Sequence, residues 1–389
     1  MTLPINELFD VAVIGGGIHG AGVAQAAAAA GYRTLLIERG EWASATSRWS
    51  SKLIHGGLRY LESAQFNLVY NSLQERQRLF RNAPTLVKPV KFFIPIYSHT
   101  RRRPWQIRAG LSLYALLTGL QAQARFRSVP RSEWKTLGGL RDDNLQAVFQ
   151  YWDGQTDDAA LTQAVIRSAQ ILNTIALEHS ELLAANKTGN GFELRIKTGD
   201  DEWQCAARAV VNATGPWVNE LIQRCTPAVS PRAISFVKGA HIVLPPAQLP
   251  GIFYLEAPRD GRAIFVMPWR GKTLVGTTEM EIDSPAALPS IQEINYLQET
   301  VATYFPHLSC DVLDSFAGVR VLPTGTGRAF SRARESIIEC IGDDDAPLIS
   351  IYGGKLTTYR HTAELVIDTL REKLGNKPAR ADTKTLPLI

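Results

Sequence analysis

The chain has 389 residues, 45% of them hydrophobic and 20% charged, and it carries a formal net charge of +5. This composition is typical of a globular protein of one or two domains and excludes a disordered or fibrous chain. The basic excess does not indicate nucleic-acid binding, because no basic stripe interleaved with aromatic residues accompanies it.

Four scattered cysteines without a C-x-x-C pair predict a reducing compartment, no disulfide and no cysteine-based metal site. No apolar run is long enough to span a bilayer, and the first strand starts at Phe9, so we expect neither a membrane span nor a secretory signal. The expected location is therefore cytoplasmic.

A basic cluster precedes a short apolar segment in the first half of the chain. Arg101, Arg102, Arg103 and Arg108 lie just before Ala109–Leu120. The cluster fits a solvated loop leading into a packed helix. It fits equally a basic amphipathic segment that holds the protein on the inner face of the cytoplasmic membrane.

A glycine-rich turn between a strand and a helix is the most specific signal near the N-terminus. Phe9–Ile14 predicts a buried parallel strand, Gly15, Gly17 and Gly20 form G-x-G-x-x-G, and an alanine-rich helix runs to about Ala30. In such units the first glycine makes a tight turn, the second lets a pyrophosphate touch the backbone and the third lets helix pack on strand. The helix N-terminus adds bare N–H groups and a positive dipole end.

An acidic residue follows the second strand of this unit. Glu38 ends the strand Thr34–Ile37, roughly 20 residues beyond the glycines, where a carboxylate accepts hydrogen bonds from ribose hydroxyls. Because a carboxylate repels a 2′-phosphate, Glu38 disfavours NADP. NAD and FAD both remain possible from these residues.

Glu41–Tyr60 is rich in serine and glycine and shows no periodicity, which predicts a long loop of functional importance. Its hydroxyl groups and its lysine could meet phosphate and ring-edge atoms of a cofactor. His55-Gly56-Gly57 would let backbone pass close to a planar ring, and Arg59 adds a cation.

The rest of the chain divides into recognisable segments. Leu145–Trp152 predicts a strand, Ala159–Leu172 a helix capped by Asp157 or Asp158, and Ala176–Gln204 a β-meander. Residues 231–278 contain short strands at close spacing, which predict a mostly antiparallel sheet in a second lobe. A strand at Leu348–Tyr352 then leads into two glycines and a helix, again with bare N–H groups aimed at a ligand.

Several of these segments resemble the FAD-dependent glycerol-3-phosphate dehydrogenase family, over nearly the whole chain. The family's A-T-S and S-S-K-L-I-H-G-G-L-R-Y-L motifs are matched within Ala45–Leu61, and N-A-x-G-P-W at Asn212–Trp217. Its G-S-H-I-V and G-T-T-D motifs are matched with Ala240 in place of serine and Glu279 in place of aspartate. G-V-R at Gly318–Arg320 is similar to its G-V-R-P-L motif.

The resemblance implies an α/β fold plus an antiparallel sheet: a Rossmann-type FAD-binding domain, glutathione-reductase or D-amino-acid-oxidase-like, with a mixed α+β substrate domain. We expect the FAD-binding domain at residues 1–95, 146–225 and 315–389, and the substrate domain at residues 96–145 and 226–314. Family members commonly continue into a C-terminal helical domain, whereas this chain stops at Ile389. Oligomer contacts and the natural electron acceptor are therefore left open.

The glycine turns and the resemblance together give a set of expected cofactor contacts. These are Gly15, Gly17, Ile18, His19, Gly20, Glu38, Arg39, Thr46, Ser47, Lys52, Leu53, His55, Gly56, Leu182, Ala213, Gly215, Trp217, Gly318, Gly354, Lys355, Leu356 and Thr357. No metal is expected.

The reaction implied is the oxidation of sn-glycerol 3-phosphate to dihydroxyacetone phosphate, with hydride transfer from C2 to flavin N5 and electrons passed to quinone or oxygen. A dianionic phosphate needs several cations. The expected substrate contacts are Arg59, Tyr60, Arg320, Arg332 and Lys355, with Arg334 as an alternative to Arg332.

Proton removal needs a base near the operating pH, and histidine is the usual choice. His241 is the first candidate and His55 the second, while Arg320 or Lys355 could stabilise the developing alkoxide. Two other functions stay open. One is an FAD-dependent oxidase or dehydrogenase of a small amino acid or 2-hydroxy acid, and the other is a non-catalytic flavin-binding protein.

Overall fold

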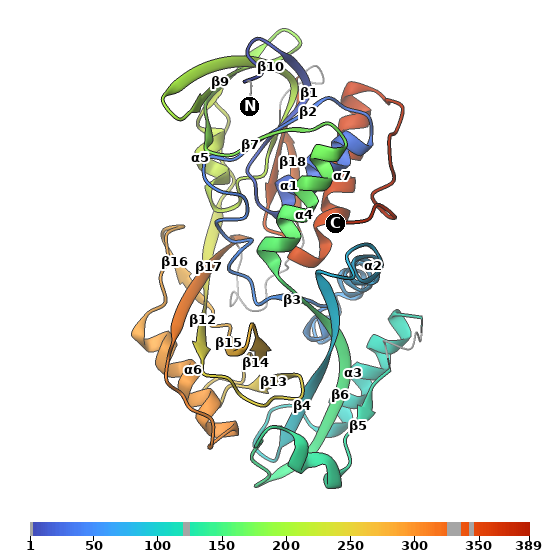
Figure 1. The fold of residues 1–389 in the computed structure, drawn as a ribbon, viewed down its shortest axis with the longest axis vertical. Helices are drawn as coiled ribbons and strands as arrows, with labels where there is room; N and C mark the ends of the chain where they lie inside the picture. The colour runs from blue at the N-terminus through green and yellow to red at the C-terminus, as the bar shows by residue number, and fades with distance from the viewer. Residues whose placement is uncertain (1–2, 120–124, 325–335, 342–345) are drawn as a thin grey trace.

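The computed structural model describes residues 3–119, 125–324, 336–341 and 346–389. The chain forms two lobes, each built on one large β-sheet, that meet near the middle of the long axis (Figure 1). The first lobe contains both chain ends, and its sheet is called sheet A below. The second lobe contains sheet B.

Sheet A combines a parallel centre with an antiparallel flank. Its strands run in the order β11-β8-β9-β10-β1-β2-β7, with β19 paired to β10 and β18 to β19. β1 pairs in parallel with both β10 and β2, so that the apolar β1 is buried in the middle of the sheet, whereas β8, β9 and β10 form the predicted meander. The strand bounds are β1 Leu8–Ile14, β2 Thr34–Ile37, β7 Ile175–Leu177, β8 Ser180–Thr188, β9 Gly191–Thr198, β10 Asp201–Asn212, β11 Cys225–Thr226, β18 Ile337–Ile341 and β19 Leu348–Tyr352.

Three helices cover one face of sheet A: α1 (Ile18–Ala29), α4 (Asp158–Ile171) and α7 (Tyr359–Leu374). α1 is buried on nearly all sides, because its small alanine and glycine residues let α4 and α7 approach it closely. A Cβ atom at Gly22 would lie 2.6 Å from the ring of Tyr359. The side chain of Asp157, one of the two candidates named from the sequence, caps α4 by accepting a hydrogen bond from the Ala160 N–H.

Sheet B is mostly antiparallel and forms the second lobe. Its strands run in the order β16-β12-β15-β14-β13-β4-β6-β3, with β17 paired to β12 and β5 to β6. The strand bounds are β3 Leu53–Ile54, β4 Val87–Tyr97, β5 Arg127–Ser128, β6 Leu145–Thr156, β12 Ile234–Leu244, β13 Ile252–Glu256, β14 Ala263–Trp269, β15 Lys272–Gly276, β16 Met280–Ile282 and β17 Asp314–Pro323.

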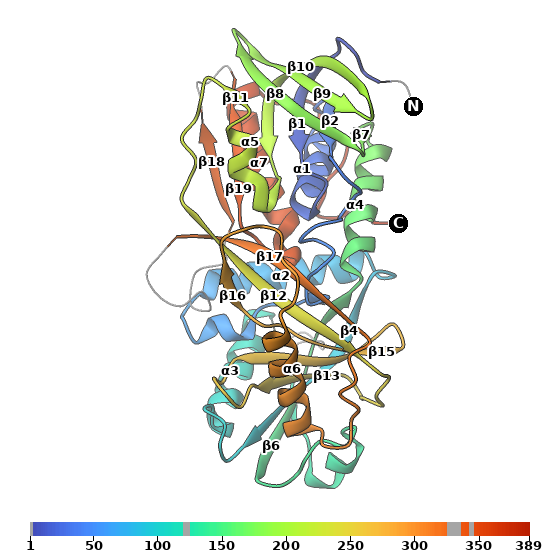
Figure 2. The ribbon, with the colours of Figure 1, turned by 90° about the vertical axis from the view of Figure 1, so that its left-hand side faces the viewer.

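Helices α2 (Phe66–Asn82) and α3 (Pro104–Leu117) lie beside sheet B near β4 and β6, α6 (Ile291–Tyr304) lies near β12, and the short α5 (Val218–Ile222) packs against sheet A (Figures 1 and 2). Ser290 and Glu293 form a capping box at the start of α6. Within the described ranges, every helix is either too short or too polar to cross a bilayer.

The fold class predicted from the sequence is confirmed. The expected domain boundaries differ from a division by sheets. β3, β4, β6 and β17 belong to sheet B, whereas most of their residues lie in the segments expected to form the FAD-binding domain. β4 and β6 are long antiparallel strands that extend from beside the first lobe to the far end of the second, β4 running away from the first lobe and β6 running back toward it (Figure 1). We therefore propose to divide the chain by sheet membership.

Candidate active site

A cavity of about 660 Å³ lies between the lobes and is lined by residues of both sheets. Its lining brings together the two glycine turns, the loop after β2 and the cationic residues that the sequence singled out. These segments come from opposite ends of the chain.

The amino-terminal glycine turn is shaped as its motif requires. Gly15 has φ +111°, and a Cβ atom at Gly20 would lie 1.8 Å from the carbonyl oxygen of Gly15. Only glycine therefore lets α1 start this close to β1. Within the turn, the Ile18 N–H donates to Ser47 Oγ at 2.8 Å, which ties the long loop to the helix N-terminus.

Glu38 holds this end of the cavity in shape as well as lining it. Its two carboxylate oxygens accept from the N–H groups of Gly16 at 2.7 Å and Gly40 at 2.8 Å. Nearby, the Arg39 guanidinium lies 4.4 Å from the ring centre of Trp217. Leu182 also lines the cavity, and its carbonyl accepts from Arg224 Nη1 at 2.6 Å.

The carboxy-terminal glycine turn meets the first turn through His19. Gly353 and Gly354 have φ +71° and +103°, and a Cβ atom at Gly354 would lie 2.2 Å from His19 Nε2. Burial lowers the pKa of His19 to about 4, so its ring is neutral near pH 7. Its Nδ1 is buried and has no hydrogen-bond partner among the described residues. A polar ligand at this junction would satisfy that atom.

The cationic groups gather beside the second turn. Lys355 Nζ lies 3.9 Å from the ring centre of Tyr60, and Arg59 Nη2 donates to the Tyr60 hydroxyl at 3.3 Å. Arg320 Nη1 lies 3.7 Å from Glu279 Oε1. All of these side chains line the cavity, so that two guanidinium groups and one ammonium group lie in its wall. Arg332 and Arg334 lie outside the described residues.

The two candidate histidines differ sharply in position. His55 lines the cavity, and its backbone N–H donates to Thr357 Oγ1 at 3.3 Å. His241 does not line the cavity: its side chain is fully buried on β12, and its Nε2 lies 3.0 Å from Ser51 Oγ.

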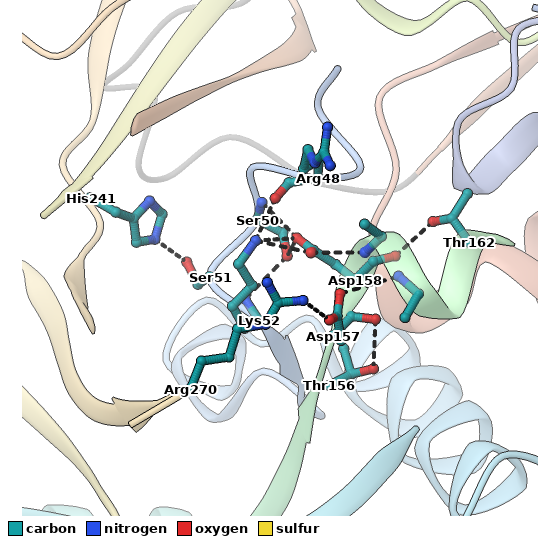
Figure 3. A network of polar contacts seen from close by, with 12 residues as sticks. Arg48, Ser50, Ser51, Lys52, Thr156, Asp157, Asp158, Thr162, His241 and Arg270 are labelled. Atoms are coloured by element: carbon teal, nitrogen blue, oxygen red, sulfur yellow. Dashed lines mark hydrogen bonds and ion pairs between the residues drawn. The ribbon is translucent and has the colours of Figure 1, made fainter. Parts of the chain in front are cut away.

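Most of the cofactor contacts expected from the sequence line this cavity, and three do not. Gly20 lies behind Gly15, as described above. Lys52 is buried and its ammonium group donates to Asp158 at 2.9 Å (Figure 3). The Gly56 N–H donates to the Tyr114 hydroxyl at 2.8 Å. The residues that do line it are Gly15, Gly17, Ile18, His19, Glu38, Arg39, Thr46, Ser47, Leu53, His55, Leu182, Ala213, Gly215, Trp217, Gly318, Gly354, Lys355, Leu356 and Thr357.

Residues 10–360 match the family of FAD dependent oxidoreductases. Over 98% of its length, the chain is 37% identical to a glycerol-3-phosphate dehydrogenase of Synechocystis sp., covering 73% of that protein. It is 36% identical to the aerobic glycerol-3-phosphate dehydrogenase of Escherichia coli, over 98% of this chain and 77% of that protein. The chain belongs to the FAD-dependent glycerol-3-phosphate dehydrogenase family.

The solved structures agree with this membership. A glycerol-3-phosphate dehydrogenase from Bacillus halodurans complexed with FAD matches with a TM-score of 0.76 and 28% identity, over 99% of this chain and 68% of that one. An L-α-glycerophosphate oxidase from Mycoplasma pneumoniae shares the fold with a TM-score of 0.75 at 18% identity, with coverage of 96% and 97%.

As a member of the glycerol-3-phosphate dehydrogenase family, the chain is an FAD-dependent oxidoreductase. Its own geometry fits FAD in two respects. His19 Nδ1, which has no hydrogen-bond partner in the described part of the chain, lies beside both glycine turns. Gly215 has φ +58° in the cavity lining, and no described atom lies within 4 Å of an added Cβ atom. The site therefore has both a polar group to be satisfied and room for a bulky ligand.

Several cavity residues were not singled out from the sequence. Arg262 carries no motif at all, and its Nη1 donates to the backbone carbonyl of Glu279. Glu279 was noted only as a departure from the family motif, yet its carboxylate faces Arg320. The glutamate in place of the family's aspartate was the signal that the sequence offered for this residue. The longer side chain of glutamate changes the distance between the Arg320 guanidinium and the backbone at position 279.

Proposed function

We propose that this protein oxidises sn-glycerol 3-phosphate to dihydroxyacetone phosphate, with FAD as the hydride acceptor. The observation that carries the proposal is the gathering of Arg59, Arg320 and Lys355 around one cavity beside the second glycine turn. A phosphate dianion needs this much positive charge, because each guanidinium gives two donors in a fixed fork and the lysine adds a point charge.

The cofactor would be held by the residues that shape the two turns. Backbone N–H groups at the start of α1 would face the pyrophosphate, and Glu38 would accept from the ribose hydroxyls. When bound, FAD would supply the hydride acceptor for the reaction. The turn at Gly353 and Gly354 and the following η6 (Leu356–Thr358) and α7 would place N–H groups at the ring.

The base is better assigned to His55 than to His241, which the sequence favoured. His55 lines the cavity and can reach a substrate hydroxyl there, whereas His241 is fully buried behind Ser51. Geometry decides before pKa in such assignments. Arg320 would stabilise negative charge on the substrate oxygen as the proton leaves.

A longer polyol phosphate is the nearest alternative substrate. The chain is also 36% identical to the D-erythritol 1-phosphate dehydrogenase of Brucella abortus, over 92% of this chain and 72% of that one. Both substrates present a phosphate and a secondary alcohol, so the same cations serve either. A small amino acid or 2-hydroxy acid is less suited, because a single carboxylate needs only one of the three cations.

Electrons would then pass to quinone or oxygen, and α3 offers a face for docking at an anionic membrane surface. Trp105 and Leu116 on this helix are 70% and 62% exposed. Arg108 is exposed on the same helix, and Arg101 is exposed shortly before the helix begins. Arg102 contributes little to that face because it is ion-paired with Glu62 and Glu256. Charge reversal of Arg101 and Arg108 together should weaken sedimentation with anionic vesicles and leave turnover in solution unchanged.

A substrate panel tests the proposed function. The purified flavoprotein is assayed with an artificial electron acceptor and sn-glycerol 3-phosphate, D-erythritol 1-phosphate, glycerol, glycine or lactate. We expect kcat/KM to be highest for one of the two phosphorylated alcohols, with glycerol slower by at least 10³-fold because the phosphate contacts are lost. Preference for glycine or lactate would refute the proposal.

A further inference from the structure

The imidazole ring of His241 is packed inside sheet B and does not reach the cavity. Its neighbours across the sheet are Phe316 on β17 and Gly276 on β15. The Phe316 ring stacks on the imidazole with a centroid distance of 4.9 Å and an interplanar angle of 16°. On Gly276, a Cβ atom would lie 2.2 Å from the imidazole. The ring is therefore fixed between a phenyl face and a glycine backbone.

The hydrogen bonding of His241 assigns the direction of its contact with Ser51. Nε2 lies 3.0 Å from Ser51 Oγ, whereas Nδ1 is buried and has no partner among the described residues. Buried N–H groups left without an acceptor are rarer than buried acceptors left unused, so the single proton of the neutral ring belongs on Nε2. His241 then donates to Ser51.

The imidazole stays neutral because of where it lies. Burial, followed by the positive charges of Arg320 and Lys52, lowers the pKa of His241 well below its ordinary value. A ring that resists a second proton is a poor base, but it is a steady hydrogen-bond donor.

Ser51 is anchored from both sides in the chain. The N–H and hydroxyl groups of Ser50 donate to one oxygen of Asp158 at 3.0 and 2.7 Å, and Lys52 Nζ donates to the same carboxylate at 2.9 Å. Asp158 is 1% exposed at the start of α4. Figure 3 shows Ser50 and Lys52 converging on Asp158 while Ser51 points toward His241. Ser51 itself lines the cavity.

We propose that the Ser51 hydroxyl donates a hydrogen bond to the oxygen on the reacting carbon of the substrate, and that His241 is a positioning residue that fixes this direction by donating to Ser51. Because the Ser51 oxygen accepts from the imidazole, its own proton must point elsewhere, and the cavity is the open side. The inference rests on the proposed function, since it presumes an alcohol substrate.

The step balances without a change of protonation at either residue. The alcohol proton would pass to the cavity base, for which His55 is the candidate, and bound FAD would supply the two-electron oxidant for the carbon. The substrate oxygen gains negative charge before the carbonyl forms, and the hydrogen bond from Ser51 strengthens as it does so. Ser51 and His241 each keep their single proton.

Four variants test the assignment: Ser51→Ala, Ser51→Thr, His241→Gln and His55→Gln. Removing one donor to a developing oxyanion costs about 10²–10³-fold in kcat. We expect this loss in Ser51→Ala with little change in KM, and recovery of most of the activity in Ser51→Thr, which keeps the hydroxyl. His241→Gln keeps a donor and should lose about tenfold or less in kcat.

The pH profile of kcat/KM separates a positioning residue from a base. In His241→Gln the acidic limb should stay at its wild-type pH, whereas in His55→Gln it should disappear. Loss of the limb in His241→Gln, with the limb kept in His55→Gln, would overturn the proposal and make His241 the base. The FAD content of each variant shows whether it has folded. If His241→Gln is unstable, the comparison of kcat between Ser51→Ala and Ser51→Thr tests the proposal.

A second readout does not depend on turnover. The carbonyl stretch of dihydroxyacetone phosphate bound to the oxidised enzyme should move to higher frequency in Ser51→Ala, because a donor to that oxygen is gone. An unchanged stretch would overturn the proposal. Failure of the proposed function is recognised separately, because the wild-type protein would then neither bind this ketone nor reduce its flavin with either phosphorylated alcohol.

Discussion

In the proposed function, the two ends of the cavity recognise charge by different means. At the nucleotide end, one short segment from Gly15 to Glu38 supplies backbone N–H groups and a carboxylate, and its shape depends on glycines that no other residue can replace. At the reacting end, Arg59, Arg320 and Lys355 come from segments far apart in the chain and act through long side chains. The first end is fixed by backbone geometry, and the second by the packing of two sheets.

The largest expected effect lies at the nucleotide end. In Gly20→Ala the new Cβ would lie 1.8 Å from the Gly15 carbonyl oxygen, so the turn cannot form and the purified protein should contain no FAD. The matched control is Gly110→Ala, where nothing lies within 4 Å of the added atom and helix propensity improves. Absorbance spectra of the two proteins measure the flavin. Normal FAD content in Gly20→Ala would contradict the account of this turn.

The next largest effect separates the two ends. Arg320→Ala should lower kcat/KM for glycerol 3-phosphate about 10³-fold while FAD content stays at the wild-type level, because a charged bidentate contact to the substrate is lost. Arg320→Lys should recover part of the loss.

The control for this substitution is Arg127→Ala, which removes an exposed arginine paired with Glu133 and should change nothing measurable. Loss of flavin in Arg320→Ala would show that the two ends are not independent.

The two ends also differ in how well the sequence predicts them, because one is built from local backbone and the other from the packing of two sheets. The glycine turn is local, so Gly15, Gly17 and Glu38 could be read from spacing alone. At the reacting end only residues inside family motifs, such as Arg320 and Lys355, were found. Arg262 was missed because long-range strand pairing brings it to the cavity, and for the same reason the sheet membership of β4 and β6 does not follow from the local sequence.

The choice of base shows the same limit. Residue type marked both His55 and His241 as candidates, but burial on β12 and the contact with Ser51 depend on the pairing of three strands. No spacing in the sequence reports that arrangement.

A smaller effect concerns the wall of the reacting end. Glu293 accepts from Thr278 Oγ1 at 2.6 Å and is ion-paired with Lys238 at 2.7 Å, and so holds the cavity-lining Thr278 in place. Burial opposes ionisation here, but hydrogen bonds from Lys238, Thr278 and Ser290 keep the pKa of Glu293 below its ordinary value. Glu293→Gln should therefore lose about 1–3 kcal/mol of unfolding free energy at pH 7.

The pH dependence of that loss has a definite sign. A carboxyl whose pKa is lowered in the folded state stabilises the fold above its unfolded pKa, and this stability is lost as pH falls through the folded pKa. The gap between wild type and Glu293→Gln in urea unfolding should be full at pH 7 and should shrink below about pH 4.5. A gap that grows toward acid would contradict the assignment.

The smallest effect returns to the nucleotide end. Glu38→Gln keeps the size of the side chain but replaces one oxygen by an NH₂ group that cannot accept from the ribose or from the Gly16 and Gly40 N–H groups. We expect about a tenfold weaker FAD affinity on reconstitution of the apoprotein, equivalent to about 1.4 kcal/mol, with kcat of the saturated enzyme unchanged. A drop in kcat at saturating FAD would show that this end also affects the chemistry.

The most direct test of the whole account is an anaerobic titration of the purified flavoprotein with sn-glycerol 3-phosphate, followed by the visible absorbance of the flavin. We predict that the flavin bleaches on addition of this substrate and regains its colour when a quinone analogue or air is admitted. A flavin that stays oxidised with glycerol 3-phosphate and D-erythritol 1-phosphate, but bleaches with an amino acid or a hydroxy acid, would contradict it.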